Sequence, residues 1–503
     1  MVTRKEIKAL TEREPRFDDI TSTIRATGNQ PKWIIKEFRE VMAIARKFAD
    51  EVIRPYTLEL DLKLTQDPTY LPKEFIRKAN EWGLYTVFLP KMFGGKGYNL
   101  SCVGVFLEEL GSACLAMANL VGVHYLGYTM LTSSWDLRLL NELSLEIVNG
   151  EKNGEPCLLS LAMTEPDAGT DSQNVEVMDT GNLRCHAQKV DGGYILNGTK
   201  IFISCGHLST WHIVHAYTDL NRASENTIMF AVKTGAEGFS FGKKEKKMGQ
   251  QGCPASELIF KDCFIPDEYV CMDNRTNIKL KRNYAGTNEQ VFAYIWGASR
   301  MGVGSFGTAA ARGAYEEALK FATENEVDGE PLLNHEWCQC MLAEMYRNVA
   351  VSRATYIEAT QANAMHGLWK IMNVKPMYYM NKLTPGFINQ KLIAWLSQKP
   401  IMTTIFRKIC FDWQTDEEID RIDGWGSLAK ITGTDAGVKN CQMALDIMGQ
   451  SGLRHSNRAE KILRDAKLLQ IYEGTNQVNR VNVYKRMIKR SSEHTEAFLP
   501  TNI

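Results

Sequence analysis

The residue pattern of the chain changes from helical to β-strand spacing at the stretch Leu161-Ala162-Met163-Thr164-Glu165-Pro166-Asp167-Ala168-Gly169-Thr170-Asp171. Hydroxyl side chains, a proline and a glycine follow one another in it, which is typical of a loop that faces an anion or a cofactor. An ordinary turn between a helix and a strand has a similar composition, so this stretch alone leaves both interpretations open.

On either side of this loop, the chain divides into segments of different texture. Before it, apolar residues recur with helical spacing, with breakers at Pro55, Pro72 and Gly94 to Gly97. After it, short runs rich in β-branched and aromatic residues alternate with Gly and Asn, and long helical patterns return from Asn288. A chain of 503 residues is too long for one ordinary domain. The expected units are an N-terminal extension (1–33), a helical domain (34–156), a β domain (157–272) and a C-terminal helical domain (288–490).

One segment of the last unit, 366–427, departs from this pattern and is interpreted as a helical insert. Between His366 and Trp413 there are seven Lys or Arg and a single acid, Asp412. The apolar residues predict two short amphipathic helices separated by Pro400. An acidic stretch, 416–423, follows. Either it neutralises the lysines within the molecule, or the insert contacts an anionic membrane surface or the acidic face of a partner protein.

The overall composition excludes several classes of protein. Lys plus Arg and Asp plus Glu are balanced at 59 each, which argues against binding to nucleic acid. The 12 cysteines have no metal-binding or redox spacing, so we expect reduced, packed thiols and no metal site. No apolar stretch is long enough to span a bilayer, and residues 1–20 lack the features of a secretory signal. The expected location is the cytoplasm.

Two further patterns are interpreted as structural. The fingerprint G-x-G-x-x-G occurs at Gly302, Gly304 and Gly307, but a long helix follows it rather than a βαβ unit. We therefore expect these small residues to let two helices pack closely. His212 and His215 differ by an odd number of positions on a predicted strand, so their side chains point to opposite faces and form no metal site.

A second candidate segment follows the first loop. Its Asn197-Gly198 dipeptide predicts a tight hairpin turn that leads into a strand with Phe202 and Ser204 on one face. An aromatic ring beside a hydroxyl suits a flat cofactor, and the alternative is an ordinary core face.

The third candidate segment is Arg464-Asp465-Ala466-Lys467 with Ile471-Tyr472-Glu473-Gly474-Thr475 shortly after it. A carboxylate between Tyr and Gly, where a helix passes into a loop, projects into a cleft while its backbone N–H faces a ligand oxygen. The alternative is a solvated Glu at a helix end.

Together these three segments, in this order and with these separations, resemble the acyl-CoA dehydrogenase family. The resemblance covers about Ile34 to Ala364 and Leu428 to Lys489. It extends to Pro90 to Gly97 (PKMFGGKG), Lys247-Met248-Gly249 and Arg300 at the start of the small-residue helix. The fold it implies is an α+β multidomain chain with an N-terminal helical domain, a central β-barrel domain and a C-terminal four-helix bundle, here with an extra helical insert.

The resemblance also assigns roles to single residues. Glu473 matches the catalytic base, and a base on the helix of Arg300, as in some members, is absent because Ala298 and Ser299 carry no carboxylate. Thr164 and Ser204 are expected to hydrogen-bond the flavin ring of FAD. The cofactor-binding residues implied are Leu161, Met163, Thr164, Gly169, Thr170, Phe202, Ser204, Thr475 and Gln477. The substrate-binding residues implied are Thr170, Arg300, Tyr472 and Gly474.

The sequence departs from the family pattern in three places. Asn325 stands where many members have an Arg that reaches the FAD pyrophosphate of a neighbouring subunit, and Asp446 stands where the family has Gln. A carboxylate near a phosphate is unfavourable, so the adenine half of FAD is expected to be held differently. The insert 366–427 interrupts a region that builds subunit contacts in the family, which leaves the choice between homodimer and homotetramer open.

The reaction implied is the oxidation of a saturated acyl-CoA thioester to the trans-2-enoyl thioester. A base removes the α-proton, the β-hydride passes to flavin N5, and an electron-transfer flavoprotein accepts the electrons. Rival interpretations on this fold are an acyl-CoA oxidase, an enoyl-CoA reductase and a relative of the flavin monooxygenases. A degenerate scaffold that binds FAD poorly is a further alternative, which flavin absorbance distinguishes.

The resemblance places the stretch Phe106 to Val123 along the acyl cavity. The residues that it offers there are Met117, Ala118, Leu120 and Val121. No Arg, which members acting on dicarboxylic acyl groups usually have, occurs in this stretch. We therefore expect an uncharged acyl chain.

Overall fold

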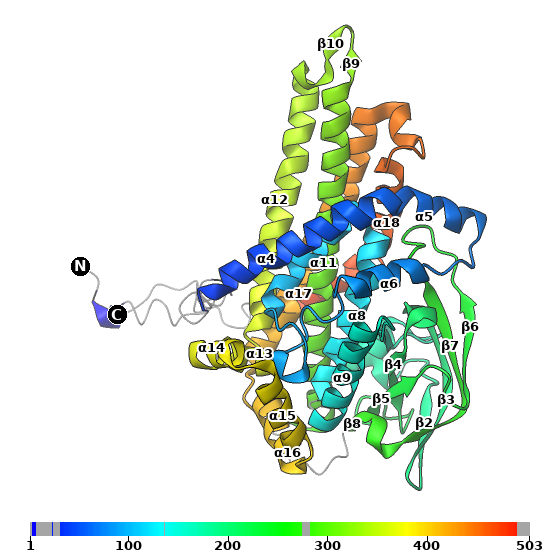
Figure 1. Cartoon of the computed structure of the whole chain (residues 1–503), viewed down its shortest axis with the longest axis vertical. Helices are drawn as coiled ribbons and strands as arrows, with labels where there is room; N and C mark the ends of the chain where they lie inside the picture. Colours follow the sequence, from blue (N-terminus) through cyan, green and yellow to red (C-terminus); the bar gives the residue numbers. More distant parts are fainter. Residues whose placement is uncertain (1–2, 7–22, 24–30, 135, 274–281, 490–503) are drawn as a thin grey trace.

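The chain folds into three units, which the computed structural model describes over residues 3–6, 23, 31–134, 136–273 and 282–489 (Figure 1). Helices come first, a β-sheet follows and a second set of helices completes the chain. This order confirms the expected α+β multidomain class. Most of the predicted extension 1–33, and most of the junction between 272 and 288, lie outside the described residues.

The N-terminal unit packs around α7 (Val103–Ala113), which is buried along its whole length. α8 (Leu115–Ser134) and the amphipathic α4 (Trp33–Phe48) both contact α7. The remaining segments are the π-helical turn η1 (Ala49–Ile53), α5 (Arg54–Gln66), α6 (Lys73–Glu81), the 3-10 turns η2 (Lys91–Phe93) and η3 (Leu100–Cys102), and α9 (Leu137–Asn153).

Pro55 does not interrupt the helix, contrary to prediction. α4, η1 and α5 follow one another without a gap, and Pro55 lies in the first turn of α5. Because the π-helical turn η1 directly precedes it, the α-helical hydrogen-bond ladder is already interrupted where the proline lacks its N–H. The other predicted breakers are confirmed, since Pro72 directly precedes α6 and both Gly94 and Gly97 adopt positive φ angles.

The middle unit is a mixed sheet of eight strands in the order β6-β7-β3-β2-β4-β5-β8, with β1 beside β4. The strands are β1 (Leu159–Ala162), β2 (His186–Val190), β3 (Gly193–Ser204), β4 (Trp211–Tyr217), β5 (Thr227–Lys233), β6 (Phe239–Lys244), β7 (Ala255–Pro266) and β8 (Val270–Asp273). Short helices connect some of them, namely η4 (Thr170–Gln173), α10 (Val175–Met178), η5 (Gly206–Leu208) and η6 (Asp267–Tyr269).

This sheet is not the closed barrel that was expected. Among the strands that the structure describes, β6 and β8 lie at the two ends of the order and do not pair with each other. Within this order, β1 pairs in parallel along one edge of β4, and β2 forms a single pairing with β4, His186 with Tyr217. The sheet is therefore open at β6 and β8 and has a weak junction between β2 and β4.

The predicted hairpin at Asn197-Gly198 is also wrong, because both residues lie inside the long strand β3. The register between β3 and β7 shifts there, which makes the dipeptide a β-bulge. Gly198 has a φ of 144°, and a Cβ at this position would lie 2.7 Å from Cys185 Cα, so a side chain does not fit. The turn between β2 and β3 instead contains Gly192, with a φ of 72°.

The C-terminal unit is a bundle around α11 (Tyr284–Glu324), which contacts α12 (Glu336–Ala364), α17 (Asp416–Met448) and α18 (Ala459–Leu469). Gly304 and Gly307 lie within α11, and a Cβ on Gly307 would come 2.2 Å from the backbone of Gly433 in α17. This confirms the prediction of close helix packing. The other segments are β9 (Glu326–Val327), β10 (Glu330–Pro331), η7 (Leu332–Asn334), η9 (Gly449–Leu453), α19 (Asn476–Val483) and η10 (Tyr484–Ile488).

The insert forms a chain of short helices on one flank of the bundle (Figure 1). They are α13 (Gly367–Asn373), α14 (Lys375–Leu383), α15 (Gly386–Ser397), α16 (Pro400–Arg407) and the π-helical turn η8 (Lys408–Asp412). Pro400 is the first residue of α16 and separates it from α15, as predicted. The last part of the predicted insert, 416–427, belongs to α17, which the capping box of Thr415 and Glu418 starts.

Candidate active site

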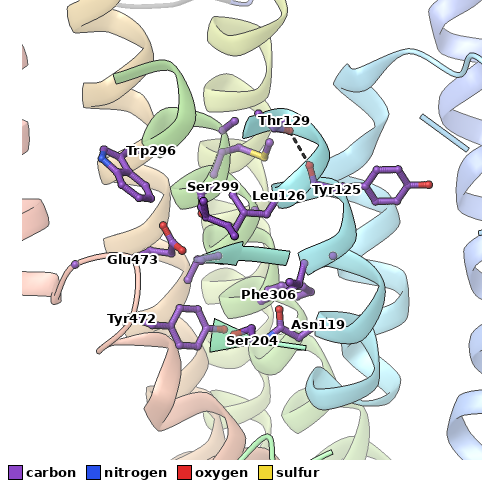
Figure 2. A pocket seen from close by; sticks show the side chains of 18 of the residues that line it. Asn119, Tyr125, Leu126, Thr129, Ser204, Trp296, Ser299, Phe306, Tyr472 and Glu473 are labelled. Carbon is purple, nitrogen blue, oxygen red and sulfur yellow. Dashed lines mark hydrogen bonds between the residues drawn. The ribbon is translucent and has the colours of Figure 1, made fainter. Parts of the chain in front are cut away.

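A cavity of about 490 Å³ is lined by residues from all three units. Its wall combines the loop 161–170, the end of β3, parts of α7, α8 and α11, and the turn that follows α18 (Figure 2). The predicted residues in this wall are Leu161, Met163, Thr164, Gly169, Thr170, Phe202, Ser204, Tyr472, Glu473, Gly474 and Thr475.

The loop 161–170 is fixed to β3 by a buried ion pair that the sequence did not reveal. Lys200 Nζ lies 2.8 Å from Glu165 Oε1 and donates to the carbonyl of Met163 at 2.9 Å. Both side chains are fully enclosed, and the second Glu165 oxygen accepts from the backbone N–H groups of Arg184 and Cys185. Because every charge in this pair is hydrogen-bonded, the loop has one defined position.

Three hydroxyl-bearing side chains from this region line the cavity: Thr164, Thr170 and Ser204. None of the three hydroxyls makes a hydrogen bond to another residue of the described part of the chain. Phe202 lies between them in sequence, with a φ of 58° at a register shift in β3 and 56% of its surface exposed. Open hydroxyls beside an exposed aromatic ring fit a flat, polar-edged ring system such as a flavin.

Glu473 lies in the turn after α18 with a φ of 57°. Its carboxylate points into the cavity between Trp296 and Tyr472 and toward Ser299 (Figure 2). Oε2 is buried and has no hydrogen-bond partner in the described residues. Burial raises the pKa of Glu473, against the opposing effects of the Ser299 side chain and the charges of Arg300 and Lys430. A buried carboxylate of raised pKa is suited to accept a proton.

The turn of Glu473 is fixed by hydrogen bonds from residues that the sequence analysis did not predict. Lys430 Nζ, from α17, donates to the carbonyl of Gly474 at 2.5 Å and to Asn476 Oδ1 at 3.0 Å. Asn479 Nδ2 donates to the Gly474 carbonyl as well, at 2.9 Å. Burial lowers the pKa of Lys430 to about 7. The available signal was a lysine in the small-residue stretch of a predicted bundle helix.

Two predicted residues do not belong to the described cavity wall. Arg300 is buried beneath the turn, where its Nε donates to the Glu473 carbonyl at 3.4 Å and its Nη1 contacts Asp423 Oδ1 at 2.7 Å. Gln477 is exposed on α19. Arg300 therefore positions the Glu473 backbone, and its expected contact with substrate stays a prediction, as does the contact of Gln477 with FAD.

The apolar part of the cavity comes from helices, but from other residues than expected. The residues of α8 in the cavity wall include Asn119, Gly122, Val123 and Leu126. The four residues that were expected there are buried but absent from the described wall, namely Met117, Ala118, Leu120 and Val121. α7 and α11 add Leu107, Val303 and Phe306. Lys247 and Glu473 are the charged residues of the wall as described.

The two residues that depart from the family pattern at the FAD phosphates lie elsewhere. Asn325 ends α11, and its side chain donates to the Phe321 carbonyl. Asp446 is exposed on α17. Neither is part of the cavity wall described above, so the wall fits the ring end of FAD and assigns no residue to its adenine half.

The expectation of no metal site rested on the spacing of the cysteines and on the two histidines of β4. His212 Nδ1 lies 2.7 Å from the Ser160 hydroxyl, while His215 is buried against Tyr217 and Phe292. The described residues contain no cluster of three His, Cys, Asp or Glu side chains that could hold a metal ion.

The fold is a three-unit architecture whose units meet at a cavity that contains a buried carboxylate of raised pKa. Models of the acyl-CoA dehydrogenase family match the chain with the N-terminal domain over 36–134, the middle domain over 160–263 and the C-terminal domain over 291–372 and 413–488. The chain belongs to the acyl-CoA dehydrogenase family. This confirms the expected family of FAD-dependent oxidoreductases, and the gap in the last match lies within the predicted insert.

Individual relatives agree with this family. Cyclohex-1-ene-1-carbonyl-CoA dehydrogenase of Syntrophus aciditrophicus (strain SB) is 26% identical over 463 residues, covering 92% of both chains. Acryloyl-CoA reductase (NADH) of Anaerotignum propionicum is 26% identical over 461 residues, covering 91% of this chain and 96% of the other. The structure of butyryl-CoA dehydrogenase from Megasphaera elsdenii matches with a TM-score of 0.67 at 22% identity, covering 90% of this chain and 98% of that one.

Proposed function

We propose that the protein oxidises a saturated, uncharged acyl-CoA thioester to the trans-2-enoyl thioester. The observation that carries this proposal is the buried, unpartnered Oε2 of Glu473 in a cavity with apolar helical walls. A carboxylate in such a site lacks the hydration that would stabilise its charge, so proton uptake from carbon becomes more favourable. Glu473 takes the α-proton of the thioester.

The backbone beside the base supplies a second group. Within the described residues, the backbone N–H of Glu473 has no hydrogen-bond partner. The residue has a positive φ, so its backbone does not continue the preceding helix. A free N–H next to the base stabilises the charge that develops on the thioester oxygen as the α-proton leaves. Arg300, Lys430 and Asn479 keep this turn in place through its carbonyl groups.

The ring of FAD is held at the loop 161–170 and the end of β3. The Thr164 and Ser204 hydroxyls are free to hydrogen-bond its polar edge, and Phe202 packs beside it. When bound there, FAD supplies the acceptor for the β-hydride. The role of the protein is to orient the thioester between this ring and Glu473 and to exclude water.

The acyl group is uncharged because the wall offers it no cationic partner beyond Lys247. That ammonium group is already bonded to the carbonyl of Cys253 at 2.6 Å. A carboxylate at the end of the acyl chain would find a counter-ion only at Lys247, and at any other point of the described wall its charge would be buried unpaired, which is unfavourable. The wall favours aliphatic or alicyclic acyl groups without distinguishing their length.

The remaining properties follow from family membership and composition. An electron-transfer flavoprotein accepts the electrons, the assembly is a homodimer or homotetramer, and the reaction belongs to the degradation of acyl groups. The cytoplasm is the expected compartment, which agrees with 12 cysteines that form no disulfide in the described part of the chain. No helix in the described ranges has the length and apolar character needed to cross a membrane.

Glu473→Gln tests the proposal. The variant keeps the shape of the base but takes no proton, so FAD stays bound while flavin bleaching by saturated acyl-CoA thioesters slows by about 10² to 10⁴-fold. Glu326→Gln, on the exposed hairpin at the far end of the bundle (Figure 1), is the matched control and bleaches normally. Retention of more than about one percent of the rate by Glu473→Gln would refute the assignment of the base.

The reverse reaction on the same site is the second candidate. It is favoured by the 26% identity with a protein named acryloyl-CoA reductase (NADH). The oxidative and the reductive reaction are distinguished by which thioester changes the redox state of the flavin. A dehydrogenase is bleached by the saturated thioester, whereas a reductase with its flavin chemically reduced is reoxidised by the enoyl thioester at a rate that exceeds bleaching.

A further inference from the structure

The insert turns an apolar helix face outward. α15 contacts η2 and α9, and its buried residues are Ile393 and Ser397. Its opposite side exposes four large apolar side chains at the spacing of a single helical face, namely Phe387, Ile388, Leu392 and Trp395. Trp395 is 60% exposed. An amphipathic helix of a globular protein normally turns such a face toward the core.

The next helix continues this surface. α16 contacts α15, has no buried residue among those described, and exposes Ile401 and Ile405 one turn apart. In Figure 1 both helices lie at one end of the molecule, on the flank of α9. We call the six residues Phe387, Ile388, Leu392, Trp395, Ile401 and Ile405 the insert face. Exposed large apolar side chains gathered on two helices that contact each other are typical of an interaction site.

Lysines accompany the insert face. Lys391 is exposed on α15 between Ile388 and Leu392, and the exposed Lys408 begins η8 directly after α16. Lys399 Nζ lies 5.6 Å from the centre of the Trp395 ring. None of these three ammonium groups forms an ion pair with a residue that the structure describes.

The acidic stretch after the insert does not neutralise these lysines. Its carboxylates are engaged elsewhere, in the pairs Asp416 with Arg282, Glu417 with Arg421, Glu418 with Lys370 and Asp420 with Arg486. Of the insert lysines, Lys370 is thus neutralised by this stretch, and Lys382 pairs with Glu37. The positive charges of Lys391, Lys399 and Lys408 beside the insert face are therefore not neutralised by this acidic stretch.

We propose that the insert face docks on the surface of a lipid bilayer that contains anionic lipids. Apolar side chains with Trp and Phe bury into the interface, while Lys391, Lys399 and Lys408 contact the phosphates of the headgroups. Attachment is peripheral, because no described helix is able to span the bilayer. The net charge of the chain is zero, so the attraction comes from this local patch.

A second copy of the chain fits the insert face less well. A twofold contact through this surface brings the same lysines of both copies together, and their like charges repel. An anionic bilayer complements both components of the surface at once, since acyl chains meet the apolar side chains and phosphates meet the lysines.

Vesicle flotation with the full-length, FAD-loaded protein tests the proposal. The protein binds vesicles of phosphatidylglycerol and phosphatidylcholine at low salt, and high salt weakens binding. Replacing Lys391, Lys399 and Lys408 by Gln lowers the partition coefficient about 10²-fold, because each lysine contributes about fivefold near an anionic surface. Replacing Leu392, Trp395 and Ile401 by Ser lowers it by at least about 10²-fold through lost apolar burial.

Trp337→Ser is the matched control, because Trp337 is similarly exposed on α12, outside the insert. It binds vesicles like the unaltered protein, and flavin absorbance verifies that every variant is folded. Failure of the unaltered protein to bind anionic vesicles at low salt overturns the proposal. So does binding to phosphatidylcholine alone that is equally tight and independent of salt. If the Ser variant instead changes the sedimentation coefficient while no form binds vesicles, the insert face is a contact between copies.

Discussion

Lys430→Met is expected to impair catalysis by releasing the turn that carries the base. Lys430 Nζ donates to the Gly474 carbonyl and to Asn476 Oδ1. The Gly474 carbonyl keeps Asn479 Nδ2 as a second donor at 2.9 Å, so the loss falls on Asn476 Oδ1. Removal of one buried hydrogen bond to a charged group corresponds to about 1.5–3 kcal/mol. This predicts a decrease of about 10- to 150-fold in kcat/KM if the whole loss acts on the transition state.

The charge of Lys430 also affects the pH dependence of kcat/KM, which a lysine with a purely structural role would leave unchanged. Burial raises the pKa of Glu473, and the cation of Lys430 acts against this rise. Without the cation, the carboxylate is less stable and the pKa of Glu473 rises further. At a given acidic pH a smaller fraction of the base is deprotonated, so the acid limb of the kcat/KM profile moves to higher pH.

The assay is the rate of flavin bleaching by an acyl-CoA thioester as a function of pH. Lys439→Met on the same helix is the matched control, since Lys439 is exposed and pairs with Glu344 far from the turn. It leaves both the rate and the pH profile unchanged. If Lys430→Met retains kcat/KM within about twofold, with an unmoved acid limb, the reasoning about the turn is wrong.

Three further predictions address the rest of the molecule. Thr164→Ala and Ser204→Ala should change the flavin potential and reduction rate more than the thermal unfolding temperature, and unchanged potentials would mean that these hydroxyls do not face the ring. Asp446→Gln should tighten FAD binding if its carboxylate faces the phosphates, whereas weaker binding in a fluorescence titration would reveal a cationic partner. Gly307→Ala should destabilise the fold by at least about 1–3 kcal/mol in denaturant unfolding, because its Cβ would lie 2.2 Å from the Gly433 backbone; full stability would exclude tight packing there.

The order of the three units and the place of Glu473 were predictable because they depend on local signals. Hydrophobic periodicity separates helices from strands, and the turn after a helix that ends near Leu469 is visible in the Tyr-Glu-Gly sequence. The phase of the acyl-side helix was not predictable in this way. The resemblance placed the stretch along the cavity but did not fix which of its side chains face it. Cys114, with a φ of −162°, breaks the helical path between α7 and α8, so no single helical periodicity relates the residues of the two helices.

The buried lysines that hold the loops of the site were not predicted, for a different reason. A lysine in a sequence is normally taken as exposed, yet Lys200 and Lys430 are both fully buried. Their partners, the Glu165 carboxylate and the Gly474 carbonyl, come from segments 35 and 44 residues away. The open sheet was missed similarly, because whether the end strands β6 and β8 pair is decided only once strands distant in sequence come together.

The two cations beneath Glu473 act on the base in different ways. Asp423 lies 2.7 Å from Arg300 Nη1 and compensates the charge of the guanidinium group. Lys430 forms no ion pair with a described residue, and burial lowers its pKa to about 7. The local charge that titrates near neutral pH is therefore that of Lys430. As the pH rises through about 7, Lys430 loses its proton and its stabilising effect on the carboxylate, which makes Glu473 a stronger base where it is already deprotonated.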